Sequence, residues 1–84
     1  MGRTLKTANQ VILDEQQAFA DFRRALRKED QRIFDLLFAG ARRNTAAISQ
    51  AAHALPFEAI LLAMVLEQAK EIERLKRLLD EGLS

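Results

Sequence analysis

The sequence predicts an all-α protein, because helix-forming residues dominate it, sustained alternation of polar and apolar residues is missing, and helix breakers are scarce. Its 84 residues include three glycines and one proline, which leaves no room for a linker or a second domain. We therefore expect one domain over residues 1–84. Within it, a helical hairpin and a long C-terminal helix should assemble with other copies into an oligomeric helix bundle.

The first predicted helix covers residues 7–28 and follows an N-terminal arm over residues 1–6. Thr7 and Gln10 have the spacing of a capping box, in which each side chain bonds to a free backbone N–H of the other residue. A shorter helix capped by Asp14 with help from Gln17 is the alternative, with an extended segment before it. One apolar face is expected to hold Ile12, Phe19, Phe22 and Leu26, widened by Val11, Ala18 and Ala25.

The second predicted helix covers residues 30–53 and is separated from the first by a turn. Seven of the ten residues from Arg23 to Arg32 are charged, and Asp30 is a suitable N-cap. An unbroken helix over 8–53, roughly 70 Å long, is the alternative, because apolar residues keep a seven-residue spacing through this region. Apolar residues point nearly all the way round this helix, so we expect it to be the most buried of the three. These residues are Ile33, Phe34, Leu36, Leu37 and Phe38.

Small residues follow in the second helix, where Gly40 would allow a neighbouring backbone to approach closely despite a cost of about 1 kcal/mol in helix propensity. Asn44 and Thr45 either interrupt this helix or face solvent.

The third predicted helix covers residues 56–81. Pro56 suits a first helical position, Glu58 places a carboxylate in the first turn, and Gly82 is expected to end the helix in the left-handed conformation. A seam of residues spaced by four and three is typical of a coiled coil. This seam consists of Leu61, Val65, Gln68, Ile72, Leu75 and Leu79.

Self-association is predicted because the chain carries more apolar helix surface than it can bury alone. A domain of this length buries only about 60–65% of its unfolded surface, and the absence of cysteine excludes disulfide cross-links. The stretch from Ile60 to Leu66 is apolar on every face, which requires a partner helix. We expect a homo-oligomer, most simply a dimer. Its interface should comprise Leu61, Met64, Val65, Gln68, Ile72, Leu75 and Leu79.

Composition limits the classes of function and location. The longest apolar stretch is far shorter than the roughly 18 residues needed to span a bilayer, and no signal peptide is apparent, so we expect a cytoplasmic protein that does not enter the membrane. The halves carry opposite charge, +3 over residues 1–44 (nine basic, six acidic) and −2 over residues 45–84 (four basic, six acidic). This asymmetry could steer nucleic acid or a second copy of the chain.

The sequence predicts no enzyme: we expect no catalytic residue, no metal site and no cofactor. Ser49 lies four residues before His53, but it lacks a glycine-rich elbow and an acid to orient the histidine. His53 with Glu58 is the weaker alternative for a metal or ligand site. Nucleic-acid binding is the main competing hypothesis. Its candidate contacts are Arg23, Arg24, Arg27, Lys28, Arg32, Arg42 and Arg43.

Three segments resemble a family of small prokaryotic helical proteins of unknown function. They are residues 1–5 (MGRTL), 22–30 (FRRALRKED) and 51–64 (AAHALPFEAILLAM). The resemblance covers most of the chain and implies a helical fold, with no activity, cofactor or catalytic residue to carry over.

Overall fold

The computed structural model describes residues 6–83, and all the regular secondary structure in that range is helical. The predicted all-α class is confirmed. The arm expected over residues 1–6 lies outside the described residues apart from Lys6. The elements are α1 (Ala8–Ala18), α2 (Ala20–Ala25), α3 (Lys28–Ala41), the 3-10 helix η1 (Arg42–Asn44), α4 (Thr45–Ala51) and α5 (Pro56–Leu83).

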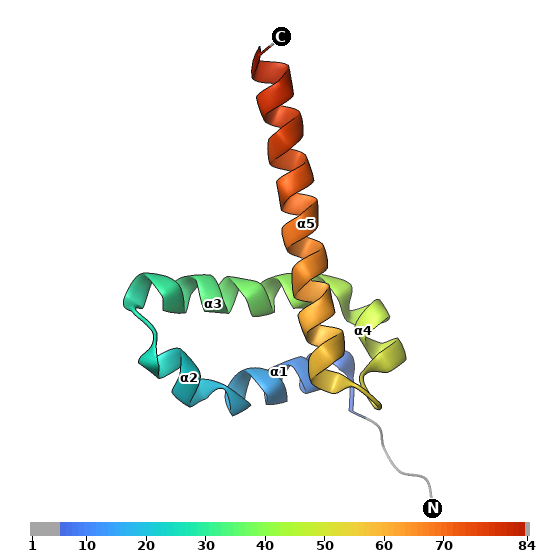
Figure 1. The fold of residues 1–84 in the computed structure, drawn as a ribbon. Coiled ribbons are helices and arrows are strands. Elements are labelled where there is room, and N and C mark those ends of the chain that lie inside the picture. The colour runs from blue at the N-terminus through green and yellow to red at the C-terminus, as the bar shows by residue number, and fades with distance from the viewer. Residues whose placement is uncertain (1–5, 84) are drawn as a thin grey trace, which may run out of the picture.

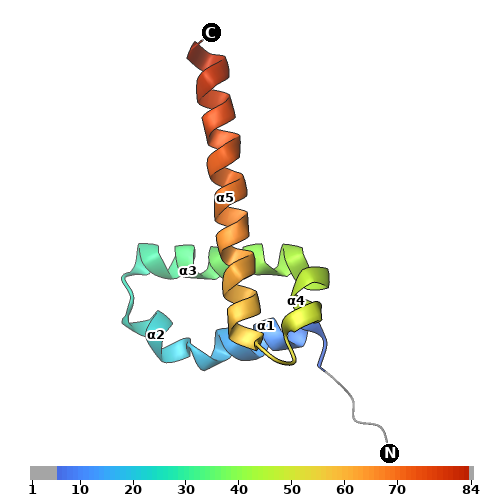
Figure 2. The same cartoon turned by 45° about the vertical axis from the view of Figure 1, so that its right-hand side comes forward.

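The helices before α5 form two arms that lie side by side, and the long helix α5 crosses both (Figures 1 and 2). In both views α1 and α2 make one arm, and α3 runs back alongside it. At the far end of α3, η1 and α4 turn the chain toward α1 again. Helix α5 then packs against α1, α3 and α4 through its first half and projects well beyond α3 through its second half.

Thr7 caps α1 as predicted. Its Oγ1 accepts a hydrogen bond from the backbone N–H of Gln10 at 3.1 Å. The side chain of Gln10 does not complete the capping box, because its Nε2 donates instead to Oδ1 of Asp14 at 2.8 Å. Asp14 therefore lies inside the helix, and the alternative of a shorter helix beginning at Asp14 is wrong.

The single helix expected over residues 7–28 is wrong, because Phe19 interrupts it. Phe19 adopts φ −99° and ψ 20°, and its N–H bonds back to the carbonyl oxygen of Gln16 at 3.3 Å. Leu26 and Arg27 are extended, with ψ values of 157° and 156°, and they separate α2 from α3. The chain turns there, so the alternative of an unbroken helix over 8–53 is wrong as well.

Side chains close the turn between α2 and α3. The guanidinium of Arg23 donates two hydrogen bonds of 2.8 Å to the carboxylate of Asp35. These bonds lower the pKa of Asp35 from its ordinary value. The side-chain amide of Gln31 donates to the carbonyl oxygen of Leu26 at 3.2 Å. The turn therefore needs neither glycine nor proline.

The second helix begins earlier and ends earlier than expected. Its N-cap is Arg27, without a side-chain cap, so Asp30 lies in the first turn instead of capping it. Acidic residues are favourable there because the helix dipole presents a partial positive charge. The predicted span of 30–53 is wrong at its C-terminal end, where Asn44 leaves helical geometry (φ −126°, ψ 34°) and α4 begins anew at Thr45.

Pro56 opens α5 and Glu58 lies in its first turn, as predicted. Gly82 does not end the helix in the left-handed conformation: it lies within α5, and no glycine in the described chain has a positive φ. Helix α5 thus has 28 residues and a length of about 42 Å.

The core is small and the chain is extended. The buried apolar side chains are Ile12, Phe34, Phe38, Ala41, Ile48, Ala52, Ile60, Ala63 and Met64. The Cα radius of gyration is 15.7 Å, and the principal extents are 63 × 31 × 14 Å. A compact domain of this length has a radius of gyration of about 12 Å. The excess arises because the second half of α5 is exposed and projects beyond the other helices that the structure describes (Figure 1).

Candidate oligomer interface

The predicted seam lies exposed along one side of α5. Its five aliphatic members, Leu61, Val65, Ile72, Leu75 and Leu79, have between 46% and 65% of their surface exposed, and Gln68 is exposed with them. Leu61 follows the buried Ile60 by one residue, which rotates it by about 100° around the helix axis. The seam is therefore a second apolar face, distinct from the one that packs on α3 and α4.

Met64 departs from the predicted interface. It is buried in the chain's own core, and it occupies the same face of α5 as Ile60 and Ala63. The sequence could not separate it from the seam, because the whole segment from Ile60 to Leu66 is apolar.

Further apolar side chains of α5 and α3 are exposed outside the seam. Leu62, Leu66 and Leu78 of α5 are exposed, with Leu62 reaching 70%. On α3, Ile33 and Leu36 are exposed too, although we expected this helix to be the most buried one. So many exposed apolar side chains on a small domain are typical of an interaction site.

The five phenylalanines form one continuous row, which runs from α5 through the junction of α1 and α2 to α2 and α3. Neighbouring ring centroids are 5.1 to 6.3 Å apart, in the order Phe57, Phe19, Phe22, Phe34, Phe38. Phe34 and Phe38 are core residues, but Phe22 is 56% exposed, so the expectation that it would be buried is wrong. The row lines an apolar groove of about 190 Å³, which also includes Leu61 of the seam. We call this the phenylalanine groove.

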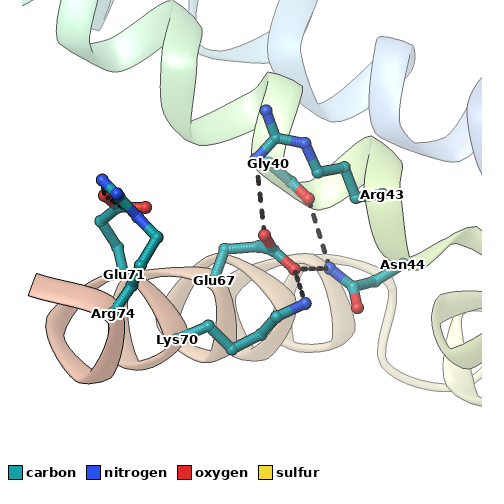
Figure 3. Close-up of polar contacts among 7 residues, drawn as sticks. All are labelled: Gly40, Arg43, Asn44, Glu67, Lys70, Glu71 and Arg74. Carbon is teal, nitrogen blue, oxygen red and sulfur yellow. Dashed lines mark hydrogen bonds and ion pairs between the residues drawn. The ribbon is translucent and has the colours of Figure 1, made fainter. Parts of the chain in front are cut away.

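Glu67 holds α5 across α3 (Figure 3). The side-chain amide of Asn44 donates to its carboxylate at 2.9 Å, and Lys70 of the same helix donates at 3.1 Å. Arg43 reaches the other carboxylate oxygen at 3.5 Å. The Asn44 hydrogen bond, then that of Lys70, lowers the pKa of Glu67 although partial burial opposes the charged form. This network fixes the middle of α5 against η1 and the end of α3.

Glu67 is charged but does not face outward from α5: its side chain is 11% exposed and contacts Asn44 and Arg43 of η1. The signal that could have revealed it is its position seven residues after Ile60 and three after Met64, on the face that the core uses.

Gly40 lies where α3 contacts α5. A Cβ atom added at this position would lie 3.4 Å from Cγ of Glu67 and 3.5 Å from its Cβ. Gly40 is itself buried. The sequence predicted that a neighbouring backbone would approach this glycine, whereas the atoms nearest to the added Cβ belong to the side chain of Glu67.

The seven basic residues considered for nucleic acid do not form one surface. Arg23 binds Asp35, Arg24 pairs with Asp21, Arg42 donates to Oε1 of Gln16 at 2.7 Å, and Arg43 contacts Glu67. The remaining three, Arg27, Lys28 and Arg32, surround the turn between α2 and α3. Helix α3 has 14 residues and separates that turn from Arg42 and Arg43 by about 21 Å.

His53 lies exposed in the turn between α4 and α5, where it borders a shallow cavity with Ser49 and Pro56. The hydroxyl of Ser49 donates to the carbonyl oxygen of Ala46 at 2.8 Å. Within residues 6–83, no group of three or more His, Cys, Asp or Glu side chains is arranged to hold a metal ion. Across the same range, no helix is long and apolar enough to cross a membrane.

The fold and the surface define the class of protein: a thin, all-α protein with one long helix, α5. The first half of α5 contributes one face to the core, and a second, apolar face, the seam, is exposed in the described structure. The chain belongs to the family described as a domain of unknown function (DUF8156), whose model matches residues 1–82. The expected membership of a family without a known function is thus confirmed. No curated protein and no solved structure matches the chain.

Proposed function

We propose that the protein is a non-enzymatic, homo-oligomeric helical module whose α5 seam pairs with the same helix of a second copy. The observation that carries the proposal is the exposure of Leu61, Val65, Ile72, Leu75 and Leu79 in a coiled-coil spacing along one face. Leaving such a face in water is unfavourable by about 25 cal/mol for each Å² of apolar surface.

The shape of the chain supports the same proposal. The shortest dimension of 14 Å is close to the width of one or two helices, so little of the chain can be interior. A partner would supply the second layer that helical domains need around a core. In a dimer, the hairpin of residues 7–53 and α5 from each copy would build a four-helix or six-helix core.

A symmetric dimer is the simplest assembly, because one self-complementary face on each copy satisfies a two-fold axis. We place the assembly in the cytoplasm, since a chain without cysteine is typical of a reducing compartment.

Light scattering on the purified protein at micromolar concentration tests the proposal. We expect a mass of two or more chains. Replacing both Ile72 and Leu75 with lysine should release monomers and cause partial unfolding, because each pair of helices would bury four uncompensated charges. Glu73→Lys makes the same change in net charge on the outward side of α5 and should leave the mass unchanged. A folded, stable monomer of the wild-type chain would overturn the proposal.

Nucleic-acid binding is the competing function. It is favoured by Arg27, Lys28 and Arg32, which have no ion-pair partner in the described part of the chain. These three residues belong to the first half of the chain, which has a net positive charge. Retention of DNA or RNA should then fall steeply with salt, and Arg27→Ala with Arg32→Ala should reduce the salt dependence. No mobility shift even at about 50 mM salt would reject this function.

A further inference from the structure

We propose that two copies of α5 pair in parallel and in register, as a two-stranded coiled coil. The inference rests on the proposed function, since it specifies the direction and register of the same pairing. Three features of the described residues carry it: the shapes of the seam side chains, the charges beside the seam, and the position of the phenylalanine groove.

Two of the three a positions and two of the three d positions in the seam follow the rule for parallel dimers, and Leu79 and Gln68 are the exceptions. In heptad terms, Val65, Ile72 and Leu79 occupy the a positions, and Leu61, Gln68 and Leu75 the d positions. β-Branched residues at a and leucine at d favour two parallel strands, because each layer then contains two identical side chains of the preferred shape. In an antiparallel pair each layer would instead mix an a with a d residue.

The charges beside the seam complement each other in the parallel arrangement. Glu71 occupies a g position and Lys76 the e position five residues later, and both are exposed. A parallel dimer brings each g residue next to the following e residue of the partner. Glu71 of one copy would therefore meet Lys76 of the other, twice by symmetry. An antiparallel pair that sets Ile72 opposite Gln68 would place the two Glu71 carboxylates near each other and repel them.

The phenylalanine groove favours the same direction. Leu61 belongs both to the seam and to the lining of the groove, so the groove lies at the N-terminal end of the seam. A parallel pair brings the apolar N-terminal ends of both seams together. An antiparallel pair would set each groove beside the last turns of the partner's α5, which carry Arg77, Asp80 and Glu81. Burying those charged groups against phenylalanine rings would be unfavourable.

Disulfide trapping tests the direction, and the chain suits it because it contains no cysteine. In a parallel, in-register pair the two copies of Leu79→Cys face each other within the Cα distance of about 4.4–6.8 Å that a disulfide requires. We expect quantitative cross-linking on mild oxidation. In an antiparallel pair the two copies of Leu79→Cys would be about 27 Å apart and would not cross-link. A mixture of the Leu61→Cys and Leu79→Cys variants would instead form cross-links between one variant and the other. Glu73→Cys, on the outward face, is the matched control and should cross-link poorly.

The mass of reduced Leu79→Cys separates the two proposals. A dimeric mass without cross-linking would overturn the parallel register while the proposed dimer stands. A monomeric wild-type chain would overturn both.

Charge reversal gives a second, independent readout. Lys76→Glu should raise the dimer dissociation constant roughly three- to tenfold, because each Glu71 would then face a carboxylate of the partner. Adding Glu71→Lys to Lys76→Glu should restore most of the affinity, since the pairs are re-formed with exchanged signs. Lack of this rescue would show that the two positions do not meet and would overturn the register.

Discussion

Asn44 and Glu67 join η1 to α5 by a hydrogen bond of 2.9 Å, and the same Asn44 amide nitrogen donates to the carbonyl oxygen of Gly40 at 3.3 Å. One side chain thus ties the end of α3 to the middle of α5 (Figure 3). Because the bond lies where the two helices cross, it governs the angle at which the free half of α5 leaves the core.

The Glu67 network should make stability depend on pH. The folded protein lowers the pKa of Glu67 below its ordinary value of 4.5, chiefly through the hydrogen bond from Asn44. A lowered pKa in the folded state stabilises the protein above the unfolded value, and this contribution is lost as the pH falls through the folded pKa. We expect the free energy of unfolding of wild type to fall more steeply below pH 4.5 than that of Glu67→Gln.

Urea denaturation from neutral pH downward measures this difference. The carboxylates of Asp14, Asp35 and Glu71 also have lowered pKa values, but they contribute equally to both proteins and cancel in the comparison. Asn44→Ala should give an intermediate slope. Parallel pH profiles for wild type and Glu67→Gln would contradict the network.

Replacing Gly40 with alanine should stabilise the protein by about 0.5–1 kcal/mol. The added Cβ would meet Glu67 Cγ at 3.4 Å, an ordinary contact distance, while alanine gains helix propensity. Gly40→Leu should have the opposite effect and cost about 1–3 kcal/mol, because α5 occupies the space. Gly82→Ala is the control without a neighbour within 4 Å. Thermal unfolding distinguishes these signs, and a loss of stability in Gly40→Ala would mean that the helices cannot separate even slightly.

Ile60 and Leu66 test the division of α5 into a core face and exposed faces. Ile60 is 0% exposed, and Ile60→Ala should cost about 2–5 kcal/mol by removing buried methyl groups and leaving a cavity. Leu66 is exposed on a side of α5 away from both the core and the seam, so Leu66→Ala should cost less than about 1 kcal/mol. Chemical denaturation of both variants checks the ratio. Equal costs would show that Leu66 is buried in the assembled protein.

Local signals in the sequence predicted two helix starts correctly, those of α1 and α5. Thr7 and Pro56 act through their own side chains, by accepting a backbone N–H and by fixing φ, so a short stretch of sequence is enough to recognise them. The interruption at Phe19 had no such signal, and the turn that the run of charged residues predicted lies at Leu26 and Arg27, before the expected N-cap Asp30. They depend on distant partners, notably Asp35 for Arg23, and the sequence does not show which distant residues meet.

The same distinction applies to the candidate interface. Its spacing of four and three residues is visible in the sequence because the helix period is regular. The assignment of Met64 to the core and of Glu67 to an inward network was not predictable in this way, because it depends on where α3 crosses α5. At that crossing the side chain of Glu67 lies against Gly40.

Gln68 should weaken the pairing of α5 while restricting its register. It is the polar member of the seam and occupies a d position between Val65 and Ile72. A polar residue at a seam position costs stability because its amide must be desolvated or bonded across the interface. We expect Gln68→Leu to lower the dissociation constant at least tenfold and to allow larger assemblies, measured by sedimentation equilibrium. Gln50→Leu makes the same substitution on the exposed surface of α4 and should leave association unchanged. If Gln68→Leu associates no more tightly than wild type, position 68 does not face a second helix, and the seam must be placed on another side of α5.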